Sequence, residues 1–109
     1  MAAMEIDPSE VKRRLDAGEK IRLLDVREPF ERQQAHIAGA ELIPMRNVPQ
    51  ALNELRAGAG TLVVFCHHGM RSLQVVEWLR RQGLADCVSM AGGIDRWSTE
   101  IDPTVPRYY

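Results

Sequence analysis

The sequence predicts an α/β fold in which helices cover both faces of a parallel β-sheet. Short apolar runs alternate with helical patterns along the chain, and this order is typical of parallel sheets. Residues 61–65 are apolar without polar alternation, as expected of a central strand that is buried on both faces. The length of 109 residues and the hydrophobic content of 45% suit one domain over residues 1–109 with its own core.

The first half of the chain shows two helical patterns, each followed by a strand pattern. Asp7 and Pro8 are typical of a helix start, and Gly18 ends this first helix. We then expect a strand at 21–26, a short helix at 29–34 and a brief strand at 41–43 that Pro44 ends.

The second half begins with a helix that Asn47 could cap and that Gly58 ends. Residues 48, 51, 52 and 55 are apolar at helical spacing. The later predicted elements are the strand at 61–65, a helix at 71–82 that Gly83 stops, a strand at 87–90, and a terminal helical turn that carries Trp97.

Composition excludes several classes of partner and location. The net charge of −1, without a Lys/Arg cluster, argues against nucleic acid. No apolar run approaches membrane-spanning length, and residues 1–5 lack the basic and apolar pattern of a signal peptide. Two cysteines are too few for a disulfide scaffold. We therefore expect a cytoplasmic protein with free thiols.

Cys66 directly follows the predicted central strand and precedes a helix. At such a junction the backbone N–H groups of the loop and the first helical turn converge, and they favour an anion. A thiol in this place has its thiolate form stabilised. Gly69 supports a ring of inward amides, and Arg71 adds positive charge. Cys66 is therefore a candidate nucleophile, although a free cysteine at a strand end can also be an inert core residue.

The two histidines after Cys66 raise the alternative of a metal site. His67 and His68 are consecutive with Cys66, and the remaining candidates, His36 and Cys87, are distant in sequence. Zinc sites use spaced pairs of ligands, so we expect no metal. His67 and His68 are predicted at the rim of the pocket, where they either assist an anionic substrate or are simply solvated.

Four segments together resemble the rhodanese family of sulfurtransferases. Their sequences are LLDVREPFE (23–31), HIAGAELIP (36–44), CHHGMR (66–71) and GGIDRW (92–97). The order and spacing of the segments follow the family over nearly the whole chain, so the resemblance does not depend on one short motif.

The resemblance implies a three-layer α/β/α fold with a five-stranded parallel sheet, and a reaction. The Cys66 thiolate would take a sulfane sulfur from thiosulfate or a similar small anionic donor and pass the persulfide sulfur to cyanide, a thiol or a protein. The substrate would be bound by the loop residues His67, His68, Gly69, Met70 and Arg71, whose amides would stabilise the thiolate and the persulfide. No cofactor is implied.

The number of residues between Cys66 and Arg71 separates this reaction from phosphoryl chemistry. Rhodanese-like phosphatases and arsenate reductases place one more residue between the cysteine and the arginine. Here four residues intervene, and the tighter ring suits a single sulfur atom. We therefore do not expect phosphatase activity.

The resemblance also assigns roles outside the loop. Asp25 and Glu31 are expected to support the loop through its arginine, and Arg27 is expected to face the pocket and attract anionic donors. His36 and Gly39 match a structural turn, and Trp97 is expected to anchor the core. Cys87 matches no motif and is expected to be a buried bystander.

The C-terminal residues 97–109 resemble the tail of rhodanese modules that are fused to E1-like adenylyltransferases. Those modules supply sulfur to carrier proteins, so a protein sulfur donor or carrier is an expected partner of this chain, itself expected to be a monomer. The alternative for the tail is a Pro-rich segment that lies over the domain surface. The alternative for the whole chain is a weakly active or non-catalytic module that binds a protein partner.

Overall fold

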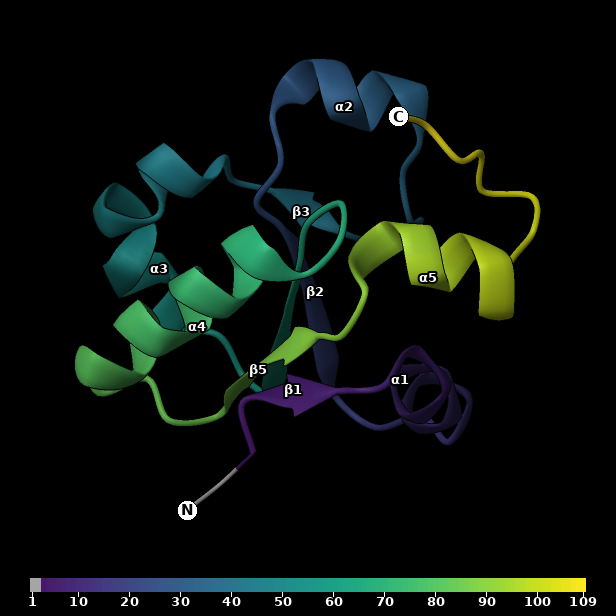
Figure 1. Cartoon of the computed structure of the whole chain (residues 1–109). Helices are drawn as coiled ribbons and strands as arrows, with labels where there is room; N and C mark the ends of the chain where they lie inside the picture. The colour runs from purple at the N-terminus through teal and green to yellow at the C-terminus, as the bar shows by residue number, and fades with distance from the viewer. Residues whose placement is uncertain (1–2) are drawn as a thin grey trace.

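A computed structural model describes residues 3–109 of the chain, and the sheet lies at its centre (Figure 1). Five strands form one sheet in the order β1-β5-β4-β2-β3, and all four pairings are parallel. The strands are β1 (Glu5–Ile6), β2 (Ile21–Asp25), β3 (Glu41–Leu42), β4 (Thr61–Phe65) and β5 (Cys87–Met90). The predicted α/β fold with a five-stranded parallel sheet is confirmed.

Helices cover both faces of the sheet, and the central strand contributes to both cores. From β4, Val63 and Phe65 lie in one buried cluster, while Leu62 and Val64 lie in the other, because successive side chains of a strand point to opposite faces. The first cluster includes side chains of α1 (Pro8–Asp16) and α5 (Gly93–Glu100). The second includes side chains of α3 (Leu52–Ala57) and α4 (Met70–Arg81). Trp97 is buried in the first cluster, as expected.

Two elements differ from the sequence-based prediction. The edge strand β1 was not predicted, because two residues are too few for a periodic pattern; it pairs with β5. The predicted helix after Asn47 is instead two 3₁₀ turns, η1 (Met45–Asn47) and η2 (Pro49–Ala51), followed by α3. Pro49 has no N–H and cannot continue the i→i−4 ladder, so tighter i→i+3 bonds replace it. Asn47 lies inside η1 and makes no cap.

The ends of the chain carry two further findings. The C-terminal residues leave α5 and return toward α2 (Pro29–Gln34), where the chain ends (Figure 1). Among the described residues, no helix has the length and apolar character that crossing a bilayer requires. Part of the N-terminal stretch that lacks a leader pattern, residues 1–2, lies outside the described residues.

Candidate active site

The loop between β4 and α4 places Cys66 at the carboxyl end of the central strand. In open parallel sheets this end is where ligands bind. Gly69 is the residue before α4 and has a φ of 109°, a left-handed conformation that glycine adopts without the penalty of a side chain. The chain thus turns directly from strand to helix, and the amides of the turn face the cysteine.

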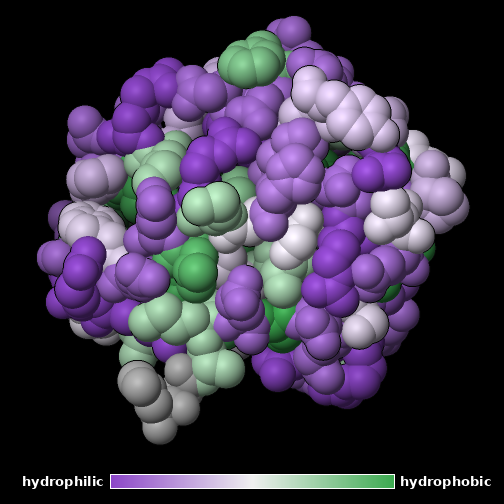
Figure 2. Space-filling view, in the orientation of Figure 1, coloured by the Kyte–Doolittle hydropathy of each residue, from purple (hydrophilic) through white to green (hydrophobic). Residues whose placement is uncertain are grey.

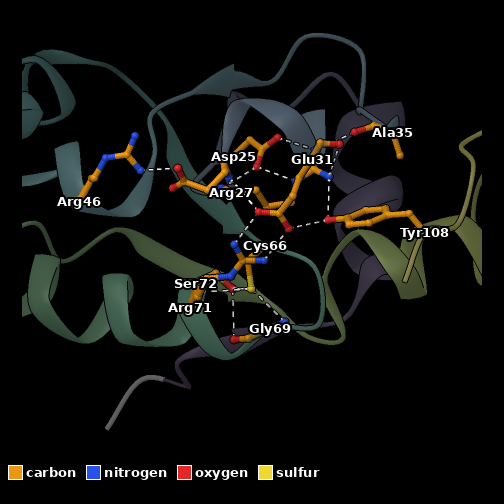
Figure 3. A network of polar contacts seen from close by, with 11 residues as sticks. Asp25, Arg27, Glu31, Ala35, Arg46, Cys66, Gly69, Arg71, Ser72 and Tyr108 are labelled. Carbon is orange, nitrogen blue, oxygen red and sulfur yellow. Dashed lines mark hydrogen bonds and ion pairs between the residues drawn. The ribbon is translucent and has the colours of Figure 1, made fainter. Parts of the chain in front are cut away.

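The sulfur of Cys66 accepts two backbone hydrogen bonds. The Gly69 N–H donates at 3.1 Å and the Ser72 N–H at 3.4 Å (Figure 3). Both donors lie at the start of α4, whose N-terminus carries partial positive charge. The Cys66 residue is only 1% exposed, so these N–H groups act on the sulfur with little screening by water.

A pair of buried hydroxyls lies against the same sulfur. Ser72 Oγ is 3.5 Å from Cys66 Sγ and 2.7 Å from Ser89 Oγ, and both serines are fully buried. Sequence reasoning gave Ser72 no role in the site. A hydroxyl near the start of the predicted helix, six residues after the cysteine, was the available signal.

The glycine turn after β5 packs against the loop that carries Cys66. The Ile94 N–H donates to the Cys66 carbonyl at 2.9 Å, and the Asp95 N–H donates to the His67 carbonyl at 3.1 Å. A Cβ on Gly93 would lie 2.4 Å from the carbonyl oxygen of His67, and this is too close for any side chain. The two loops therefore hold one another through backbone atoms.

Glu31 and Arg71 form a bidentate ion pair at the edge of the loop. Arg71 Nη1 and Nη2 donate to the two Glu31 carboxylate oxygens at 2.8 and 2.9 Å (Figure 3). The side chain of Glu31 is 8% exposed and that of Arg71 is 35% exposed. The Arg71 guanidinium, working against burial, lowers the pKa of Glu31 to about 2. Glu31 thus contacts the loop arginine, as the sequence-based assignment supposed.

Asp25 and Arg27 form a second ion pair, which is fully buried. Arg27 Nη2 donates to Asp25 Oδ2 at 2.7 Å, and both side chains have zero exposure. The guanidinium also donates to the carbonyl oxygens of Glu31 and Ala35. The expectation that Arg27 faces the pocket is therefore wrong: its charge is used inside the protein, where Asp25 and backbone carbonyls satisfy it. Asp25 supports Arg27 rather than the loop arginine.

Tyr108, from the C-terminal tail, joins the two ion pairs. Its hydroxyl accepts a hydrogen bond from Arg27 Nη1 at 3.0 Å and donates one to Glu31 Oε1 at 2.9 Å (Figure 3). Burial is the main cause that raises the pKa of Tyr108 to about 12, so the hydroxyl keeps its proton. Sequence reasoning missed this residue, because 77 positions separate it from Glu31.

The two loop histidines differ from each other in environment. The His68 side chain is 63% exposed, in agreement with the predicted rim position. The His67 ring is instead stacked between His68, at 3.8 Å between ring centroids, and Tyr108, at 3.9 Å. Its Nε2 is buried without a hydrogen-bond partner among the described residues. Burial, together with His68, lowers the pKa of His67.

The set of side chains that could surround a cation also differs from the set considered from the sequence. Ligand atoms of His67, His68 and Asp95 lie within 4.8 Å of one another, whereas Cys66, His36 and Cys87 do not belong to this group. Asp95 is already bound by Arg107, whose Nε and Nη2 lie 2.9 and 3.2 Å from its oxygens. A metal ion would have to share that carboxylate with a guanidinium.

The remaining predicted residues lie outside the sulfur's immediate surroundings. Met70 is 76% exposed at the first position of α4. His36 is exposed, and Gly39 has the positive φ of a turn residue. Cys87 is buried, and its thiol donates to the Leu84 carbonyl. Of the two cysteines, Cys66 alone has its sulfur directed at backbone N–H donors.

This geometry is suited to holding a negatively charged sulfur. Two N–H groups, a helix N-terminus and a nearby guanidinium stabilise an anion at this sulfur. Such an arrangement activates a thiolate as a nucleophile and stabilises an anionic intermediate on it.

Comparisons with known proteins agree with this chemistry. The family model for the rhodanese-like domain matches residues 7–100. A protein from Allochromatium vinosum named "Sulfurtransferase" is 33% identical over 101 residues, which cover 93% of this chain and 94% of that protein. The structure of a human single-domain sulfurtransferase superposes with a TM-score of 0.77 at 28% identity, covering 91% of this chain and 98% of the other.

A longer relative is named as an adenylyltransferase as well as a sulfurtransferase. The "Probable adenylyltransferase/sulfurtransferase MoeZ" of Mycobacterium tuberculosis is 36% identical over 105 residues, which cover 94% of this chain. The chain spans only 26% of that relative's length. With the family model matching most of the sequence, and with a relative of similar length named as a sulfurtransferase, the chain belongs to the rhodanese-like family of sulfurtransferases.

Proposed function

We propose that residues 1–109 form a single-domain sulfurtransferase that works through a persulfide on Cys66. The observation that carries this proposal is the position of Cys66 Sγ, which accepts hydrogen bonds from the Gly69 and Ser72 N–H groups at the N-terminus of α4. The same donors that favour the thiolate would also stabilise the negative charge of a persulfide on Cys66.

The first half of the cycle loads sulfur onto the cysteine. After the Cys66 thiol has lost its proton to water, the thiolate attacks the outer sulfur of thiosulfate. A new S–S bond forms on Cys66 while the S–S bond of thiosulfate breaks, and the electron pair leaves with sulfite. A persulfide donor reacts in the same way and releases its own thiolate.

The second half transfers the sulfur to an acceptor. Cyanide, a thiolate or a protein nucleophile attacks the outer sulfur of the persulfide. The bond to Cys66 breaks, and its electron pair restores the thiolate, so the cycle has no net oxidation of the enzyme. Arg71 supplies positive charge at the rim for an anionic donor, and the exposed His68 lies at the same rim.

The test is an intact-mass measurement of the loaded protein. Incubated with thiosulfate, the wild type should gain the mass of one sulfur and lose it on addition of cyanide. Cys66→Ala should gain nothing, while Cys87→Ala, the matched control with an equally buried thiol, should load normally. A panel with mercaptopyruvate and a persulfide-bearing protein identifies the donor class. No gain with any donor would overturn the proposal.

A second candidate function is the relay of sulfur to or from a partner protein. In this role the chain would act as a monomer in the reducing cytoplasm. The exposed apolar Met70 begins α4, directly after the loop that carries Cys66, and the exposed Phe30 precedes Glu31, the partner of Arg71. Exposed apolar side chains beside a functional group are typical of docking surfaces. Figure 2 shows that the face turned toward the viewer in Figure 1 is mostly hydrophilic, with smaller apolar areas among the polar ones.

Met70→Gln separates the two functions. This variant should accept sulfur from thiosulfate at the wild-type rate but from a persulfide-bearing protein several-fold more slowly, because the docking surface loses an apolar side chain while the charge near Cys66 is unchanged. Equal loss with both donors would show that Met70 acts on the cysteine loop rather than on docking.

A further inference from the structure

The C-terminal tail is fastened to the domain at several points. The Asp102 N–H donates to the Trp97 carbonyl at 2.9 Å, and the Ser98 hydroxyl donates to the carbonyl of Val105. Arg107 holds Asp95. Val105 and Tyr108 are buried, in contrast to the last residue. These contacts deliver Tyr108 to one defined place, next to the active loop.

The Tyr108 hydroxyl has a fixed direction within its hydrogen-bond chain. Arg27 can only donate, so the phenol oxygen accepts from it and its own proton points to Glu31 Oε1. The same oxygen, Oε1, accepts from Arg71 Nη2. Tyr108 therefore helps to fix the carboxylate plane that receives both nitrogens of the Arg71 guanidinium. Hydrogen bonds to an ionised group are stronger than those between neutral groups.

The ring of Tyr108 contacts the active loop as well. It stacks on His67 with 10° between the ring planes, and His67 is the residue after Cys66. One tail residue thus contacts the loop through its ring and the loop arginine through its hydroxyl, by way of Glu31. The two contacts can be separated by mutation, because phenylalanine keeps the ring and removes only the hydroxyl.

We propose that Tyr108 is a positioning residue for the Cys66 site: its hydroxyl orients Glu31 so that Arg71 presents its charge to anionic reagents at the cysteine. This proposal deepens the proposed sulfur transfer and rests on it for its biological meaning. One part of the proposal does not depend on sulfur transfer: the tail holds Arg71 in place. This part predicts how fast Cys66 reacts with any anionic reagent.

The test compares alkylation of Cys66 by iodoacetate, an anion, and by iodoacetamide, which is neutral, with peptide mapping to locate the label. Tyr108→Phe should slow the reaction with iodoacetate about threefold or more relative to iodoacetamide, as expected for the loss of one hydrogen bond to a charged group. Tyr109→Phe is the matched control, because Tyr109 is 96% exposed. It should leave the ratio of the two rates unchanged.

A double-mutant cycle distinguishes positioning from general stabilisation. In an Arg71→Ala background, Tyr108→Phe should change the rate ratio by less than about twofold, because the residue through which it acts is gone. A ratio unchanged in the single variant, or an equal fall in both backgrounds, would overturn the proposal.

Thiosulfate loading of the same variants tests whether the change in alkylation ratio is accompanied by a change in sulfur transfer. The KM for thiosulfate should rise in Tyr108→Phe more than kcat falls. If the wild type takes up no sulfur while Tyr108→Phe still lowers the alkylation ratio, the proposed transfer fails and the positioning role stands. If the wild type loads sulfur and Tyr108→Phe does not change the alkylation ratio, the proposed transfer stands and the positioning role fails.

Discussion

Cys66 and Cys87 are equally buried, at 1% exposure each, yet the structure surrounds them with opposite chemistry. Cys66 follows β4, and its sulfur accepts hydrogen bonds from N–H groups. Cys87 begins β5, and its thiol donates to the Leu84 carbonyl at 3.3 Å. A group of N–H donors favours a thiolate, whereas a carbonyl acceptor favours the protonated thiol.

The difference teaches that the end of the strand, and not burial alone, sets which hydrogen-bond partners a cysteine sulfur meets. At the carboxyl end of a parallel strand the chain enters a helix N-terminus, where N–H groups are free to bind an anion. At the amino end of a parallel strand the chain instead follows a helix C-terminus, whose last carbonyl groups have no partner within the helix. Burial raises the pKa of Cys87, although Arg80 partly opposes this. Cys87 is thus the internal reference for the reactivity of Cys66.

The largest expected effect is the difference in alkylation rate between the two thiols. In the folded chain, iodoacetamide should label Cys66 at least about a hundredfold faster than Cys87, because N–H donors favour a thiolate at Cys66 whereas burial raises the pKa of Cys87. Peptide mapping over a time course measures both rates in one sample. In 6 M guanidinium the rates should converge; comparable labelling of the two thiols in the folded protein would contradict the comparison.

Acid should weaken the ion pair that supports the Cys66 loop. The pKa of Glu31 is lowered from 4.5 to about 2, so its stabilisation is complete above pH 4.5 and is lost as the pH falls toward 2. The full contribution is about 3 kcal/mol of unfolding free energy, of which about 2 kcal/mol is lost by pH 3.

Urea unfolding of the wild type and Glu31→Gln between pH 6 and pH 3 measures this contribution. The variant should be less stable at pH 6, and its stability should fall less steeply with acid. Parallel pH dependences for the two proteins would show that Glu31 does not titrate with the lowered pKa.

Gly93→Ala should disturb the Cys66 loop by direct steric conflict. The added Cβ would lie within 2.6 Å of backbone atoms of His67, so the loop has to move and the donor geometry at the sulfur is lost. We expect sulfur loading to slow about tenfold or more, in line with the loss of a preorganised hydrogen-bond donor.

Gly83→Ala provides the matched control for this variant. Gly83 also has a positive φ, but a Cβ there would meet nothing within 4 Å. Its cost should be limited to about 1 kcal/mol of stability, with normal loading of Cys66. Equal loading by both variants would show that the glycine turn does not hold the loop.

The smallest expected effects separate the rim residues of the Cys66 site. Arg71→Ala should slow persulfide formation from thiosulfate about tenfold, because the anion loses a nearby positive charge. His68→Ala should slow it less than about threefold, since this side chain is 63% exposed and water screens its interaction with an anion. Stopped-flow loading rates at equal ionic strength compare the two, and equal or reversed effects would refute this ranking.

Local patterns in the sequence predict the parts of the site that lie close together along the chain. The apolar run of β4, followed by Cys66, Gly69 and Arg71, predicted the turn and the candidate nucleophile, because strand ends and helix starts leave local signals. The fold class followed from the alternation of these signals.

The parts that sequence reasoning missed depend on tertiary packing. Tyr108 and Ser72 meet the site only after the sheet and the tail have assembled, and no periodicity marks such contacts. The resemblance predicted Arg27 at the pocket, where its charge would attract anionic donors. Its burial depends on the combined acceptors of Asp25 and the carbonyls of α2, which become neighbours only in the folded chain.

The location of transferred sulfur tests the central claim most directly. The wild type, with both cysteines present, is incubated with the donor that loads fastest, trapped with iodoacetamide and mapped by mass spectrometry of its peptides. We predict that the alkylated persulfide is found on Cys66 while Cys87 stays unmodified. Sulfur on Cys87, or shared equally between the two cysteines, would contradict the claim that the N–H cradle after β4 selects the reactive thiol.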